Sequence, residues 1–184
     1  LGDVYKRQLD PVRLVQVPAH ATRIMYASQD AQGRPIAVTG TVLTPTAPWT
    51  GGGERPVISY AVGTQGAADR CAPSRTLSTG VQYEGVGITS LLSRGHAVVV
   101  TDYEGLGTPG AHTYMVREAQ AHAVLDAVRA AAQVSGSGVA ATAPVALAGY
   151  SQGGGASAAA AELASEYAPE LDLKGAYVGA PPAD

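Results

Sequence analysis

The chain has 184 residues, enough for one domain with a sizeable hydrophobic core. Its net charge is −3 and it contains no run of basic residues, which argues against nucleic acid or an anionic membrane surface as a partner. No apolar stretch approaches the roughly 18 residues of a membrane span, so we expect no stable membrane insertion.

The first residues stand apart from the rest of the sequence. Residues 1–8, LGDVYKRQ, resemble translated adaptor sequence from metagenomic assemblies, so we set them aside as a non-native tail. We expect residues 9–184 to form the N-terminal part of a single domain, with the true N-terminus and any export signal missing.

The first half of the chain predicts a β-hairpin followed by a buried strand. Residues 22–28 and 36–43 alternate between apolar and polar side chains, and the turn-forming cluster 30–35 separates them. Residues 56–61, PVISYA, form a short apolar run that is typical of a buried strand.

The second half alternates helices with strands. Residues 84–94 carry apolar side chains at helical spacing, and Gly95 fits the position that ends a helix. Residues 96–101 are a β-branched run that predicts a buried parallel strand, and residues 115–132 form the best amphipathic helix. A last short strand is expected over residues 174–179.

This order of elements indicates the fold class. A hairpin followed by alternating strands and helices predicts an α/β fold, a mostly parallel sheet with helices on both faces. Ligands of such sheets bind at the carboxyl ends of the strands, so the segments that follow the strands are the candidates for a site.

The chain is organised around residues 144–157, PVALAGYSQGGGAS. A short apolar strand leads into a G-x-S-x-G motif, Gly149 to Gly153, and an Ala-rich helix follows. This is the context of a nucleophile elbow, in which Ser151 takes a strained conformation that exposes its hydroxyl. Side chains at positions 149 and 153 would collide with the neighbouring strand and helix, which explains the two glycines.

Two backbone N–H groups are candidates for an oxyanion hole. The N–H of Gln152 lies at the start of the predicted helix and can face a developing negative charge. The second donor in such a fold comes from the loop after an earlier strand, and Thr64 or Gln65 in the segment VGTQG can supply it. A simple strand-to-helix turn is the alternative interpretation of that segment.

The other chemical motifs are weak. None of the four histidines follows Ser151, and His112 alone is expected at the correct edge of the sheet, as a weak candidate for the base. Gly105 to Gly110 matches a dinucleotide-binding pattern, but Pro109 and further loop residues separate it from the helix. We expect no cofactor and no metal site, since no Cys/His cluster has metal-ligand spacing.

Several segments together resemble one family. Residues 59–75, 101–110, 148–154 and 165–184 are similar to the secretory lipase family of α/β-hydrolases. The resemblance implies a secreted enzyme that cleaves carboxylic esters, including triacylglycerols, through an acyl-enzyme. It implies a lipid or ester substrate and transient contact with a lipid interface.

The resemblance also assigns roles to residues. By its pattern Ser151 is the nucleophile, and Gln152 and the loop around Gln65 form the oxyanion hole. The stretch around Cys71 resembles a cysteine-containing loop of the family, which implies a disulfide with a later cysteine. Without the resemblance, a buried free thiol is an equal interpretation of Cys71.

The family places its acid, its histidine and a helical cap after the region that this sequence covers. We therefore expect an α/β-hydrolase fold truncated after about the sixth strand, with no triad acid assigned to Asp184. Two alternatives stay open: another serine hydrolase, such as a peptidase or acyltransferase, or a non-catalytic binding module.

Overall fold

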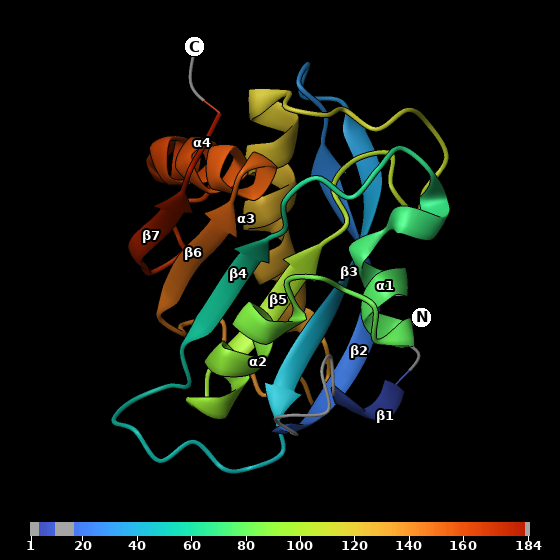
Figure 1. Cartoon of the computed structure of the whole chain (residues 1–184). Helices are drawn as coiled ribbons and strands as arrows, with labels where there is room; N and C mark the ends of the chain where they lie inside the picture. Colours follow the sequence, from blue (N-terminus) through green and yellow to red (C-terminus); the bar gives the residue numbers. More distant parts are fainter. Residues whose placement is uncertain (1–3, 10–16, 183–184) are drawn as a thin grey trace.

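A single sheet forms the centre of the molecule (Figure 1). The computed structural model describes residues 4–9 and 17–182. Within them lies a seven-stranded sheet with the strand order β1-β2-β3-β5-β4-β6-β7. Its strands are β1 (Val4–Leu9), β2 (Val17–Gln29), β3 (Pro35–Pro45), β4 (Val57–Ala61), β5 (Ala97–Thr101), β6 (Val145–Tyr150) and β7 (Leu173–Gly179).

The N-terminal side of the sheet is antiparallel. β2 and β3 form the predicted hairpin, in which the side chain of Asp30 accepts hydrogen bonds from the backbone N–H groups of Gln32 and Arg34 and closes the turn. β1 pairs with β2 and lies mostly within the stretch that we set aside as a non-native tail. The non-native origin of that stretch stays a prediction.

The other side of the sheet is parallel. β5, β4, β6 and β7 pair in parallel, and their arrows point to the same edge in Figure 1. β5 is completely buried, as its β-branched run predicts. The predicted α/β class is thus confirmed. The sheet is mixed, because the pairings β1–β2, β2–β3 and β3–β5 are antiparallel and the pairings among β5, β4, β6 and β7 are parallel.

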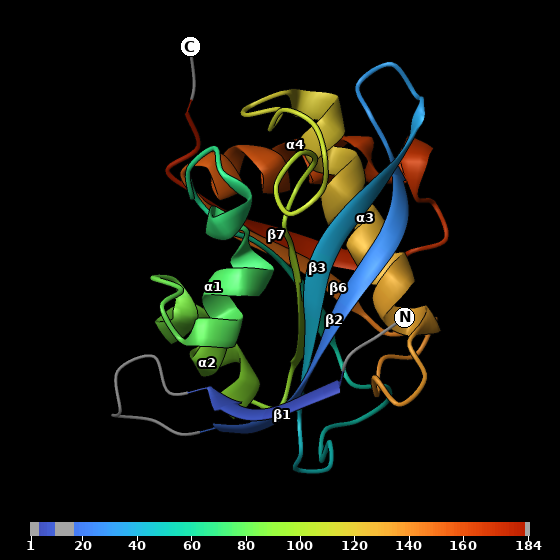
Figure 2. The same cartoon turned by 90° about the vertical axis from the view of Figure 1, so that its right-hand side faces the viewer.

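Helices cover both faces of the sheet. α1 (Pro73–Thr79) and α2 (Gly85–Ser93) lie on one face, and α3 (Arg117–Gln133) and α4 (Gln152–Tyr167) lie on the other (Figure 2). A 3-10 turn, Asp69–Cys71, precedes α1. The sequence did not predict α1, because its seven residues bury one large apolar side chain, that of Leu77.

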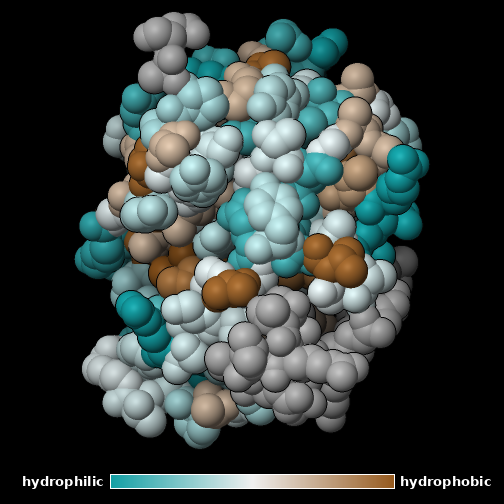
Figure 3. Space-filling view, viewed as in Figure 1, coloured by the Kyte–Doolittle hydropathy of each residue, from teal (hydrophilic) through white to brown (hydrophobic). Residues whose placement is uncertain are grey.

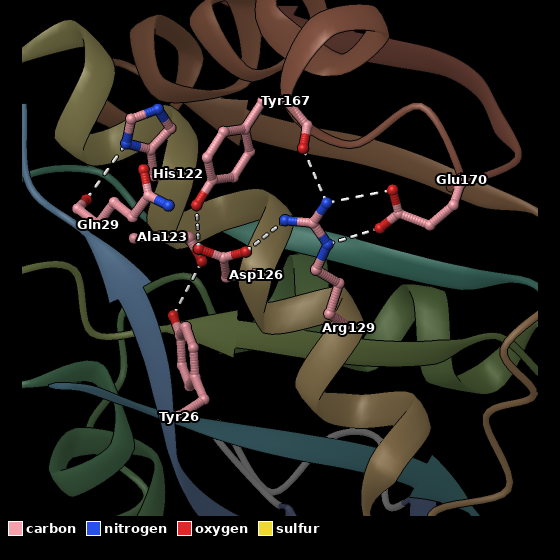
Figure 4. A network of polar contacts seen from close by, with 8 residues as sticks. All are labelled: Tyr26, Gln29, His122, Ala123, Asp126, Arg129, Tyr167 and Glu170. Carbon is pink, nitrogen blue, oxygen red and sulfur yellow. Dashed lines mark hydrogen bonds and ion pairs between the residues drawn. The ribbon is translucent and has the colours of Figure 1, made fainter. Parts of the chain in front are cut away.

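The helices on the second face are joined by a network of polar side chains (Figure 4). Arg129 of α3 donates to Glu170, which follows α4, to the backbone oxygen of Tyr167, and to Asp126 one turn before it on α3. Tyr167 in turn donates its hydroxyl to Asp126 at 2.7 Å. The network ties α3 to the end of α4 with charge-assisted hydrogen bonds.

The surface is mixed in polarity. Figure 3 shows apolar side chains scattered among polar ones on the face viewed in Figure 1. Val81 and Val86, near the start of α2, are 68% and 61% exposed. Among the residues that the structure describes, no helix combines the length and the apolar character needed to cross a bilayer.

Candidate active site

The G-x-S-x-G motif forms a tight turn between β6 and α4. β6 ends at Tyr150, α4 begins at Gln152, and Ser151 between them has φ 55° and ψ −121°. The Ser151 N–H donates to the carbonyl of Gly179 in β7 at 2.9 Å, and its carbonyl accepts from Gly155 at 3.0 Å. A non-glycine residue at positive φ costs about 1–3 kcal/mol, so the surrounding structure must hold this serine in place.

The two motif glycines lie where backbone segments meet. A Cβ on Gly149 would lie 2.1 Å from the carbonyl oxygen of Gly153, and a Cβ on Gly153 would lie 1.9 Å from that of Ala61. Real Cβ atoms essentially never come this close to another atom. These distances are the steric reason for glycine at both positions. They also show that the elbow packs directly against the end of β4.

The loop after β4 lies beside the elbow. A Cβ on Gly63 would lie 3.2 Å from the carbonyl oxygen of Tyr150. The Gly63 N–H is already used, since it donates to the carboxylate of Glu84 at 2.5 Å. This leaves the N–H groups of the next two residues, Thr64 and Gln65, as the candidates from this loop for a second oxyanion donor.

Side chains of the segment just before α2 hold the same loop. Gln65 donates its amide to the carbonyl of Gly63 and accepts from the amide of Gln82. Tyr83 donates its hydroxyl to the carbonyl of Thr64 at 3.2 Å, and burial raises the pKa of Tyr83 to about 12. These hydrogen bonds hold the loop in one position, and a backbone N–H that serves as an oxyanion donor needs such a fixed position.

Of the four histidines, the structure brings His112 to the elbow. Its Nε2 lies 3.1 Å from the side-chain nitrogen of Gln152, and its Nδ1 lies 2.9 Å from the carbonyl oxygen of Glu104. The other three lie elsewhere. His20 is in β2, His96 lies against Trp49 just before β5, and His122 of α3 stacks on Tyr167 at the end of α4.

A buried carboxylate at the end of β5 anchors the loops around the site. Asp102 is fully buried and accepts hydrogen bonds from the backbone N–H and hydroxyl of Ser74 and from the hydroxyl of Thr39. Burial raises the pKa of Asp102, although these donors act to lower it. Sequence reasoning gave Asp102 no role, yet an aspartate directly after a buried strand, at the edge where ligands bind, was a usable signal.

Cys71 ends the 3-10 turn before α1 and is half-buried. It is the only cysteine of the chain, so the expected disulfide with a later cysteine stays a prediction. Across residues 4–9 and 17–182, no three His, Cys, Asp or Glu side chains gather as metal ligands would. The glycine-rich segment 105–110 opens no helix, since α3 begins only at Arg117.

Comparison with known proteins places the chain among lipases. A sequence model described as secretory lipase matches residues 71–184. Over 182 residues the chain is 36% identical to the probable inactive lipase MT1628 of Mycobacterium tuberculosis, covering 93% of this chain and 39% of that protein. It is 33% identical to lipase 7 of Candida albicans, covering 97% of this chain and 43% of that one.

A solved structure gives the same result. Lipase A of Candida antarctica, in its closed state, matches 96% of this chain with a TM-score of 0.78 and 26% identity, and the match covers 40% of that protein. The chain thus spans about two fifths of the length of each of these relatives. Because the family match covers well over half of the present sequence, the chain belongs to the secretory lipase family.

Proposed function

We propose that the chain carries the nucleophile and the oxyanion hole of a secreted enzyme that hydrolyses carboxylic esters, including acylglycerols. The observation that carries this proposal is the conformation of Ser151, held at positive φ between a parallel strand and a helix. Membership of the secretory lipase family supports the ester substrate and the secretion.

In the proposed reaction the Ser151 hydroxyl attacks the ester carbonyl and its proton passes to a histidine base. The alcohol leaves with that proton, and water then hydrolyses the acyl-enzyme to release the acid and regenerate the serine. The N–H of Gln152 and one from Thr64 or Gln65 stabilise the negative charge on the carbonyl oxygen in both steps.

The acid and the base of the triad are proposed to lie in sequence beyond these 184 residues. In this fold they follow the nucleophile in the order Ser, Asp or Glu, His, and no histidine follows Ser151 here. The relatives are more than twice as long as the matched region, which leaves room for both residues. These 184 residues alone should hydrolyse esters negligibly.

A non-catalytic binding module is the second candidate. It is favoured by one specific observation, the relative at 36% identity that is named a probable inactive lipase. Such a module would bind an ester without cleaving it.

Hydrolysis of p-nitrophenyl esters by the complete protein separates these candidates. We expect turnover by the parent protein and a loss on the order of 10⁴-fold or more in Ser151→Ala, because the hydroxyl is the attacking group. A fluorophosphonate probe should label the parent protein at Ser151 and leave the variant unlabelled.

Ser165→Ala is the matched control, since Ser165 lies on the same helix but is exposed. It should keep parental turnover and labelling. Absence of both turnover and labelling in the folded complete protein would exclude the hydrolase and favour the binding module.

A further inference from the structure

The loop between β5 and α3 folds back on itself beside the elbow. Gly105 has φ +73°, and a Cβ there would lie 2.2 Å from the carbonyl oxygen of Ala111 and 2.6 Å from the N of His112. The hydroxyl of Thr113 donates to the carboxylate of Glu104 at 2.9 Å and closes the loop. Backbone contact at Gly105 thus fixes the place from which the His112 side chain extends.

Both ring nitrogens of His112 are engaged. The Nδ1 faces the carbonyl oxygen of Glu104, which can only accept, so the proton of the neutral ring lies on Nδ1. The Nε2 then carries a lone pair and accepts from the side-chain amide of Gln152 at 3.1 Å. Gln152 is 1% exposed and His112 is half-buried, so this hydrogen bond is partly shielded from water, and the buried Gln152 amide would be left unpaired without it.

The same loop also reaches the other side of the proposed oxyanion hole. The hydroxyl of Tyr114 lies 3.1 Å from the hydroxyl of Thr64, and the rings of His112 and Tyr114 meet edge to face at 6.1 Å. One loop therefore contacts the residue after the nucleophile and the loop after β4, the two segments that carry the candidate donors.

We propose that His112 is a positioning residue: by accepting from the Gln152 amide it holds the first residue of α4, and so the Gln152 N–H, in the geometry that an oxyanion needs. This inference rests on the proposed function. It gives His112 a role other than that of the base, because the base must present a free lone pair to the Ser151 hydroxyl.

Two variants of His112 separate the contributions of its two hydrogen bonds, one to Glu104 and one to Gln152. In His112→Gln the terminal amide reaches the position of Nε2 and can still accept from Gln152. In His112→Asn the amide reaches only the position of Nδ1, so the bond to Glu104 is kept and the bond to Gln152 is lost. The pair therefore differs in the contact that the proposal needs.

The measurement is p-nitrophenyl ester hydrolysis by the complete protein. Removing an oxyanion donor costs about 10²–10³ in kcat, so displacing one in His112→Asn should lower kcat about 10–100-fold with KM within about threefold. His112→Gln should stay within about fivefold of the parent. Equal kcat in both variants, or a loss in either as large as that of Ser151→Ala, would overturn the proposal.

A second readout does not require activity. In ¹⁵N spectra of the histidine rings, His112 should be the Nδ1–H tautomer, and its Nε2 resonance should move in Gln152→Met, which removes the donor. Gln133→Met, at the far end of α3, is the control and should leave it unmoved. If the parent protein hydrolyses no ester, the proposed function fails, while this experiment still decides whether Gln152 holds the ring. An unmoved Nε2 resonance in Gln152→Met would refute the contact.

Discussion

The elbow and the Arg129 network, which is the set of contacts that Arg129 makes with Asp126, Tyr167 and Glu170, hold the molecule together in different ways. At the elbow, backbone meets backbone: Gly149 and Gly153 leave no room for a Cβ against the neighbouring chain. In the network of Figure 4, the long side chain of Arg129 on α3 binds Asp126 on the same helix, the Tyr167 carbonyl at the end of α4, and Glu170 after it. The elbow requires that Gly149 and Gly153 carry no Cβ, whereas the network requires the charged guanidinium of Arg129 and its carboxylate partners.

The difference affects how each region should respond to substitution. A backbone contact cannot relax without moving a strand or a helix, so an added methyl group at the elbow must shift whole elements. A side-chain network that is partly exposed can replace a lost partner with water, so its loss should cost less. The substitutions below test this ranking.

Gly153→Ala should have the largest effect on stability. The new Cβ would lie 1.9 Å from the carbonyl oxygen of Ala61 and 2.6 Å from its carbonyl carbon, both of them backbone atoms of β4. Overpacking of a core typically costs 1–3 kcal/mol, and here we expect about 3 kcal/mol or more in the free energy of unfolding, because neither side can yield. Urea denaturation of the complete protein measures this loss.

Gly155→Ala is the matched control on the same helix. A Cβ there would meet the terminal methyl group of Met115 at 3.2 Å, the flexible end of a side chain. Alanine is favoured over glycine inside a helix by about 1 kcal/mol, so this variant should be neutral or more stable. Similar losses in the two variants would contradict the steric account of the elbow.

Backbone contact also explains why the elbow could be predicted from the sequence. Gly149, Ser151 and Gly153 lie close together in the chain, and their spacing follows from local geometry, so a pentapeptide with its flanking strand and helix was enough. The buried strands were predicted for the same reason, since their β-branched runs are local. The oxyanion roles of Gln152, Thr64 and Gln65 remain predictions.

Contacts between distant residues could not be predicted in this way. Asp102 binds Ser74 and Thr39, which are 28 and 63 residues away, and α1 was missed because its short sequence has little helical pattern. The Arg129 network likewise joins residues about 40 positions apart. No periodicity in the sequence records such pairs, since they arise only when the chain has folded.

Asp102→Asn should have the second largest effect. The carboxylate accepts from the backbone N–H and the hydroxyl of Ser74 and from the hydroxyl of Thr39, whereas an amide has one acceptor oxygen and presents its NH₂ group to the remaining donors. Hydrogen bonds to charged groups contribute about 1.5–3 kcal/mol, so we expect a loss of about 2–4 kcal/mol. Chemical denaturation at neutral pH measures it.

Asp172→Asn is the control for Asp102. Its carboxylate pairs with Lys174 at 2.7 Å, but the aspartate side chain is 46% exposed and the lysine 61%. Exposed ion pairs contribute about 0–1 kcal/mol, so this variant should be nearly as stable as the parent. If Asp102→Asn cost no more than Asp172→Asn, the buried carboxylate would not anchor the loops as described.

Arg129→Met should have the smallest effect of the three. The variant loses the bonds to Glu170 and to the Tyr167 carbonyl, and it leaves the buried Asp126 carboxylate with the Tyr167 hydroxyl as its remaining partner. We expect a loss of about 1–2 kcal/mol in the free energy of unfolding. Arg117→Met, which removes a more exposed pair with Glu162, is the matched control on α3 and should cost under about 1 kcal/mol.

The pH dependence of the Arg129 effect tests its electrostatic origin. The Arg129 guanidinium lowers the pKa of Glu170 below its ordinary value of 4.5. A carboxyl with a lowered pKa stabilises the fold above its ordinary pKa, and that contribution is lost as the pH falls through the lowered value. The difference in unfolding free energy between the parent and Arg129→Met should therefore be constant near neutral pH and shrink below about pH 4.5. A difference that stayed constant down to pH 3 would mean that the arginine stabilises the α3–α4 contact through packing of its aliphatic stem. Both regions would then be held by packing, and the contrast between packing at the elbow and charge around Arg129 would be wrong.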